Sequence, residues 1–163
     1  MWLVSFKSPH ILFIDKPHQD DWIMDTLLSI LIDHEGSEKS AYQDTLGYWT
    51  IGHGRLIDKR KNAGLSDEEM LYLLKNDVDS AKKELSQLDW YLSLDSVRQE
   101  VFIELVFNMG LEHLLEFIQT LKYVKLKDYK NAALQLGKSL WARQVKETRV
   151  KSIQKRLITG SYE

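Results

Sequence analysis

The clearest hydrophobic pattern along the chain is helical. Apolar residues recur at three- and four-residue steps between Leu71 and Leu85, which is the period of one face of an α-helix. Just before them, Ser66 and Glu69 have the spacing of a capping box, in which each residue satisfies a free backbone N–H of the other. The pattern predicts a long helix over about residues 66–87, long enough to join two lobes.

Helical periodicity also precedes and follows this segment. Asp25 can cap a helix whose apolar residues lead to Gly36, a residue suited to end it. Residues 95–109 predict an apolar helix that ends at Gly110. Shorter helices are predicted over 111–117, 119–126, 128–141 and 147–158, the last closed by Gly160.

Residues 40–57 have a different pattern. Tyr42 and the run from Tyr48 to Ile51 favour strands, and Leu46-Gly47 favours a turn between them. We therefore predict an α+β fold, mostly helical, with a small β-hairpin lobe over 36–65. The helical lobe would span 88–160 and include the first helix.

Residues 1–24 are set apart as an N-terminal extension of unknown role. Leu3–Phe6 and Ile11–Ile14 could form short strands, or the segment could be an arm or a linker. The first residues lack the basic start, continuous apolar core and cleavage site of a signal peptide.

Composition narrows the functional classes. The 163 residues are 44% hydrophobic and 28% charged, as in a globular chain of one ordinary domain. A net charge of −2 favours neither nucleic acid nor an anionic membrane, and no apolar run is long enough for a membrane span. With no cysteine and five scattered histidines, we expect no disulfide, metal or cofactor. We expect a monomer.

Candidate chemistry lies between the first helix and the strands. Glu35 ends the apolar helical run, Asp44 follows nine residues later, and Thr50 six residues after that. Glycosidic cleavage needs one carboxylic acid to protonate the leaving oxygen and one carboxylate to act on water or the sugar. At the edge of an apolar core, Glu35 would lose solvation, which favours its protonated form. Each residue also has an ordinary interpretation, as a helix-end glutamate, a turn-forming aspartate and a strand threonine.

Together with the surrounding motifs, these residues resemble the T-even bacteriophage lysozymes, the phage-type muramidases of glycoside hydrolase family 24. The resemblance covers about residues 25–162. Its motifs are Asp44-Thr45-Leu46-Gly47-Tyr48-Trp49-Thr50-Ile51-Gly52-His53-Gly54, Ser93-Leu94-Asp95-Ser96-Val97-Arg98, Val106-Phe107-Asn108-Met109-Gly110, Ala132-Ala133, Lys138-Ser139-Leu140-Trp141 and Thr159-Gly160-Ser161-Tyr162.

The resemblance implies a lysozyme-like fold and an enzyme that hydrolyses the β-1,4 bond between N-acetylmuramic acid and N-acetylglucosamine in peptidoglycan. It implies that Glu35 is the proton donor, that Asp44 activates or orients water, and that Thr50 assists. The substrate-binding positions that it implies are Leu56, Phe107, Thr120 and Gln135.

The setting and two other functions stay open. A lysis enzyme would wait in the host cytoplasm for a holin-type pore to release it to the wall, whereas an entry enzyme would belong to a virion tail. A lytic transglycosylase needs only the glutamate, and a catalytically inactive wall-binding or structural virion domain needs none of the three residues. The presence of Glu35, Asp44 and Thr50 favours the hydrolase over both.

Overall fold

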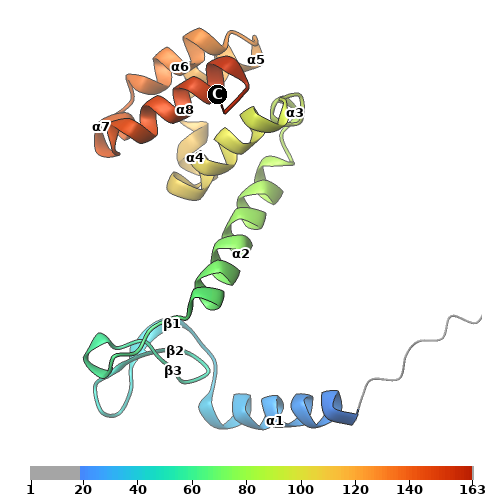
Figure 1. Ribbon diagram of the computed structural model, residues 1–163, viewed down its shortest axis with the longest axis vertical. Helices are drawn as coiled ribbons and strands as arrows, with labels where there is room; N and C mark the ends of the chain where they lie inside the picture. The colour runs from blue at the N-terminus through green and yellow to red at the C-terminus, as the bar shows by residue number, and fades with distance from the viewer. Residues whose placement is uncertain (1–18, 163) are drawn as a thin grey trace, which may run out of the picture. The chain divides into compact units, whose positions relative to one another are not determined.

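The computed structural model describes residues 19–162, with side chains from Leu27 onward. In this part of the chain it contains eight α-helices, one 3-10 turn and a three-stranded antiparallel sheet, which confirms the mostly helical α+β prediction. The structure divides into two units, one ending at Leu65 and the other beginning at Ser66 (Figure 1). The strands considered for Leu3–Phe6 and Ile11–Ile14 lie outside the described residues.

The first unit contains helix α1 (Gln19–Glu35) followed by the sheet. The expectation that Asp25 caps this helix is wrong, because α1 begins six residues earlier; no proline or glycine interrupts the chain from Gln19 to Glu35. Gly36 ends the helix, as predicted, with a positive φ of 74°, a conformation that glycine adopts at little cost.

The sheet has the strand order β1 (Glu38–Gln43), β2 (Trp49–Gly52) and β3 (Arg55–Leu56). Tyr42 pairs with Thr50 across the first hairpin, and Thr50 pairs with Leu56 across the second. Thr50 therefore lies on the central strand. The β1–β2 register shifts between Glu38 and Tyr42, an irregularity of the kind that bends a strand.

The second unit begins with helix α2 (Asp67–Leu85). The predicted capping box is confirmed, since the Ser66 hydroxyl accepts the N–H of Glu69 and the Glu69 carboxylate accepts the N–H of Ser66. A short helix that the sequence pattern did not predict, α3 (Asp89–Leu92), leads to α4 (Ser96–Leu115). Helices α5 (Ile118–Lys125), α6 (Tyr129–Gly137), α7 (Leu140–Gln144) and α8 (Glu147–Thr159) complete the unit.

One predicted helix end is confirmed at Gly110, and one predicted helix is divided at Ser139. Gly110 is non-helical, with φ 80° and ψ 156°, and it separates two helical stretches of α4, as predicted for residues 95–109 and 111–117. The single helix predicted over 128–141 is instead two helices, α6 and α7. They separate because the Ser139 hydroxyl accepts the N–H of Ala142 and caps a new helix.

The core of the second unit is apolar and lies among α2, α4, α6 and α8. Its largest fully buried side chains are Phe102, Leu85, Leu105, Leu114, Leu136, Ile153 and Leu157. Polar contacts fix α8 against α4: the Glu104 carboxylate accepts from Arg149 at 3.0 Å, and Arg98 donates to the backbone carbonyls of Leu157 and Ile158 at 2.8 Å each. This packing provides the support for the pocket described below.

Candidate active site

Glu35, the predicted proton donor, is the last residue of α1, and its carboxylate lies against the turn between β2 and β3. A Cβ atom added to Gly54 would come within 2.8 Å of its Oε2 atom, so the carboxylate lies over a position that only glycine leaves open. The same turn is tied to the end of α1, because His53 Nδ1 donates to the Gly36 carbonyl and lies 3.2 Å from the Ser37 hydroxyl. These contacts hold the helix end and the turn together.

The expected apolar surroundings of Glu35 are not found within this unit. Glu35 is exposed, and the apolar side chains of its own helix are 42–49% exposed, namely Leu27, Leu28, Ile30, Leu31 and Ile32. A helix end next to exposed apolar residues does not remove the carboxylate from water.

Asp44 organises the turn between β1 and β2. Its Oδ1 atom accepts the backbone N–H groups of Leu46 at 2.9 Å and Tyr48 at 2.8 Å, and its carbonyl accepts the N–H of Gly47. Aspartate commonly closes turns in this way, so the ordinary structural role considered for Asp44 is present. The carboxylate is half-buried, and its orientation is fixed by two backbone donors.

Thr50 is buried, with only 3% of its surface exposed. Its hydroxyl donates to the Tyr48 carbonyl at 3.3 Å, while the Tyr48 N–H donates to Asp44. The Tyr48 backbone thus connects the side chains of Thr50 and Asp44. Leu56, a predicted substrate contact, is half-buried opposite Thr50 on β3, so Glu35, Asp44, Thr50 and Leu56 all belong to the first unit.

Sequence reasoning missed a buried carboxylate that braces this turn. Asp58 is 2% exposed and accepts the Trp49 N–H at 3.0 Å and the Arg60 side chain at 2.8 and 2.6 Å. Arg60 also donates to the Gly47 carbonyl at 2.6 Å. The Arg60 hydrogen bonds, followed by that of the Trp49 N–H, hold the pKa of Asp58 far below its usual range.

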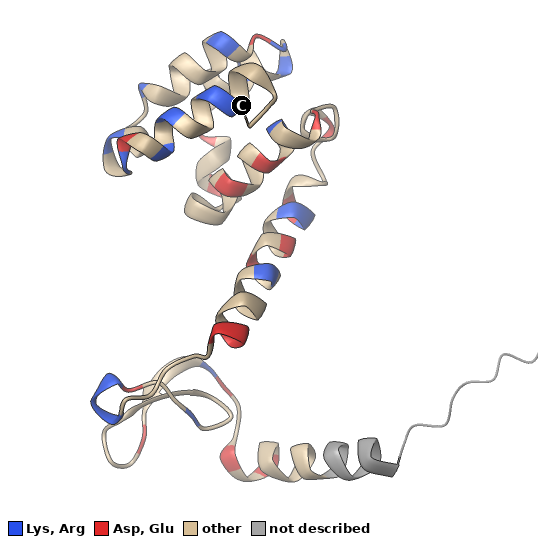
Figure 2. Ribbon diagram, viewed as in Figure 1, with Lys and Arg blue, Asp and Glu red and all other residues tan. Residues whose placement is uncertain are grey.

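Arg60, the basic partner of Asp58, belongs to the 3-10 turn Lys59–Lys61, which is coloured blue in the first unit in Figure 2. The Arg60 guanidinium and the Lys61 ammonium lie 5.1 and 4.6 Å from the centre of the Tyr48 ring, within the range of cation–π contacts. In the sequence, Lys59–Lys61 is a short charged run like that of an exposed loop, and only the structure shows that Trp49 and Gly47 lie beside it.

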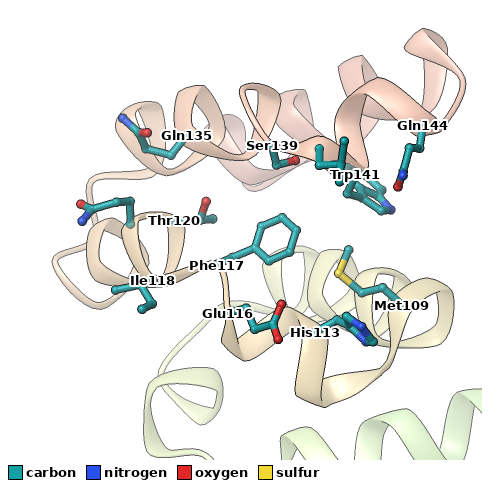
Figure 3. Close-up of a pocket in the computed structure, with 12 residues that line it drawn as sticks. Met109, His113, Glu116, Phe117, Ile118, Thr120, Gln135, Ser139, Trp141 and Gln144 are labelled. Carbon is teal, nitrogen blue, oxygen red and sulfur yellow. The ribbon is translucent and has the colours of Figure 1, made fainter.

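The second unit brings Thr120 and Gln135 together at a pocket of about 610 Å³. Thr120 comes from α5 and Gln135 from α6, and Figure 3 shows Phe117 and Trp141 farther along the same pocket. The Trp141 indole N–H donates to Asn108 at 2.6 Å, which fixes the ring. Two of the predicted substrate-binding residues thus share a pocket.

Phe107 does not line that pocket. Its ring is 45% exposed and lines a smaller hollow of about 270 Å³ with residues of α2 and α4, including Asp77, Glu84 and Gly110. An exposed aromatic ring can stack on the apolar face of a sugar. Phe107 is therefore not part of the buried core.

The described residues show neither a metal site nor a membrane-spanning helix. Between residues 19 and 162 no cluster of three or more histidine or carboxylate side chains is arranged to hold a metal ion. Among those same residues, none of the helices combines the length and apolar character needed to cross a membrane. What the structure offers is carboxylate and hydroxyl chemistry in the first unit and a polar–apolar pocket in the second.

A family model described as phage lysozyme matches residues 32–157. A relative from Dictyostelium discoideum named probable T4-type lysozyme 1 is 31% identical over 137 residues, which are 68% of this chain and 81% of the relative. Probable T4-type lysozyme 2 of the same organism is 27% identical over 149 residues, 75% of this chain and 88% of the relative. The chain therefore belongs to the phage lysozyme family, a family of peptidoglycan-hydrolysing glycosidases.

Proposed function

We propose that the protein hydrolyses the β-1,4 bond between N-acetylmuramic acid and N-acetylglucosamine. Glu35 protonates the leaving glycosidic oxygen, Asp44 activates the attacking water, and Thr50 helps to orient that water. The observation that carries the proposal is the presence, in one small unit, of a carboxylate at the α1 end and a second, rigidly held carboxylate at the β1–β2 turn.

The two carboxylates suit different roles. Glu35 is exposed and borders a glycine turn, so a sugar oxygen can approach it. Asp44 has one oxygen committed to two backbone N–H donors, which leaves its other oxygen to accept from water. General acid–base catalysis of this kind contributes about 10²–10⁴-fold per group.

The test compares wild-type protein with Glu35→Gln on purified peptidoglycan, with Glu38→Gln as the matched control. Glutamine retains nearly the same shape but has no proton to donate, and Glu38 is an exposed glutamate three residues away on β1. We expect Glu35→Gln to lower kcat by about 10²–10⁴-fold and Glu38→Gln to clear peptidoglycan like wild type.

The products distinguish the reactions. A hydrolase releases a reducing sugar with one added water, and inversion at the anomeric carbon would show that water attacks directly while Asp44 acts as a base. Anhydro products would instead indicate a lytic transglycosylase. Clearing by neither wild type nor Glu35→Gln, with both folded, would refute the hydrolase and favour a wall-binding or structural domain.

A further inference from the structure

The pocket of the second unit has an unusual distribution of charge. Its walls include the apolar side chains of Phe117, Leu140 and Trp141, and its other lining groups are mostly hydroxyls and amides. Among its twelve lining residues, Glu116 is the one carboxylate and none is a lysine or arginine; His113 lies beside it. The pocket therefore combines apolar surface with a single negative charge.

The position of Glu116 follows from the end of α4. Glu116 is the C-cap of this helix, and its backbone N–H donates to the His113 carbonyl at 3.2 Å. In Figure 3 its carboxylate lies beneath the Phe117 ring, while Thr120 and Gln135 lie toward the other end of the pocket. Glu116 follows the short helical stretch 111–115 beyond the break at Gly110, and within the part of the chain that the structure describes its exposed carboxylate has no hydrogen-bond or ion-pair partner.

We propose that Glu116 makes this pocket a binding site for a primary ammonium group carried on the substrate, the side-chain amine of the diamino acid in a peptidoglycan stem peptide. The inference depends on the proposed function, because it assumes that peptidoglycan is the substrate. A charge-assisted hydrogen bond from ammonium to carboxylate would be supported by the adjacent Phe117 ring, whose face attracts cations.

The chemistry of the substrate supports this choice. The N-acetylated glycan has no cationic group, whereas an un-cross-linked stem peptide carries a free amine on an aliphatic side chain. Cross-linking converts that amine into an amide and removes its charge. Glu116 would therefore make the enzyme favour glycan next to un-cross-linked stems.

The experiment measures hydrolysis of soluble, un-cross-linked peptidoglycan strands before and after N-acetylation of their amines, at pH 8, where imidazole is neutral and the amine is charged. For wild type we expect acetylation to lower kcat/KM about fivefold to tenfold, chiefly through KM. Glu116→Gln should lose a similar factor on native strands and respond little to acetylation. Glu112→Gln, an exposed glutamate one turn earlier that does not line the pocket, should respond like wild type.

A de-N-acetylated glucosamine could supply the same ammonium, so a second substrate separates the sources. Strands stripped of stem peptides by an amidase should be insensitive to Glu116→Gln even after partial de-N-acetylation. Sensitivity of those strands would overturn the stem-peptide assignment, and equal acetylation effects in wild type and Glu116→Gln would overturn the role of Glu116.

A binding measurement keeps this inference independent of catalysis. A disaccharide–tetrapeptide with a free amine should shift the Trp141 indole N–H resonance of the Glu35→Gln protein, and its acetylated form should bind about fivefold to tenfold more weakly. Equal affinity for the two forms would refute the ammonium site. If wild type failed to hydrolyse any strand while this difference persisted, the proposed catalysis would fail and the ammonium site would stand.

Discussion

Replacing Gly54 with alanine should separate the positioning of Glu35 from the stability of the fold. Gly54 has φ +77°, and a Cβ atom there would lie 2.8 Å from Glu35 Oε2. Gly52, on the other side of the same turn, has φ +67° and nothing within 4 Å of its added Cβ. The two substitutions impose similar backbone strain, but Gly54→Ala alone meets the carboxylate.

The structure gives the size of each effect. Placing alanine in the left-handed region costs roughly 1–2 kcal/mol, so both variants should lose a comparable amount of unfolding free energy. To reach ordinary contact at 3.4 Å, the Glu35 carboxylate must retreat by about 0.6 Å. Since misplacement by 1 Å can cost about 10²-fold in rate, we expect Gly54→Ala to lower kcat by about 10–100-fold.

The assay combines denaturant unfolding with initial rates on soluble peptidoglycan strands at saturating concentration. Gly52→Ala should keep kcat within about threefold of wild type, because its added methyl group contacts nothing. Equal losses of kcat in the two variants would refute the argument, since backbone strain alone would then explain both.

Three further substitutions probe the two units. Asp58→Asn should remove a source of pH dependence. Because folding lowers the pKa of Asp58 through Arg60, the stabilisation from Asp58 is present above about pH 4 and is lost as the pH falls toward the folded pKa. Unfolding midpoints measured from pH 7 downward should therefore fall less steeply in the variant, and parallel curves would contradict this. Trp141→Phe should lower the unfolding free energy by about 1–3 kcal/mol, because the Asn108 oxygen loses its 2.6 Å donor; an unchanged thermal midpoint would show that this hydrogen bond contributes no net stability. Ser66→Ala should cost about 0.5–2 kcal/mol by removing the α2 cap, as urea titration would show, and restoration by Ser66→Asp would confirm that the side-chain oxygen is responsible.

The elements that depend on neighbouring residues were predictable from sequence. The Ser66–Glu69 box and the Gly160 helix end are both present, the latter with φ +68°, because each signal acts within a few residues. The predicted start of α1 was wrong. Asp25 is a residue type that often caps helices, but no helix-breaking residue lies between Gln19 and Asp25, and the helix begins at Gln19. At Gly110 the local signal was sufficient, because this non-helical residue with φ 80° separates two helical stretches where the sequence predicted a helix end.

The candidate site was predictable only as far as its contacts are local. Asp44 bonds residues two and four positions away, so its turn can be recognised from sequence. The environment of Glu35 depends on Gly54, nineteen residues later, and the role of Asp58 depends on Trp49 in a neighbouring strand. Neither pairing leaves a periodic signal, because each joins single residues across different elements.

The short sequence distances within the first unit have a kinetic consequence. Its candidate catalytic residues and their supports lie between Glu35 and Arg60, so every contact among them closes a loop of fewer than thirty residues. Short loops cost little closure entropy, and hairpins of this size form within about 1–10 μs. After a local opening, the turn carrying Asp44 and the turn facing Glu35 should therefore re-form far faster than a glycosidase turns over, which at a typical kcat of about 10 s⁻¹ takes roughly 100 ms.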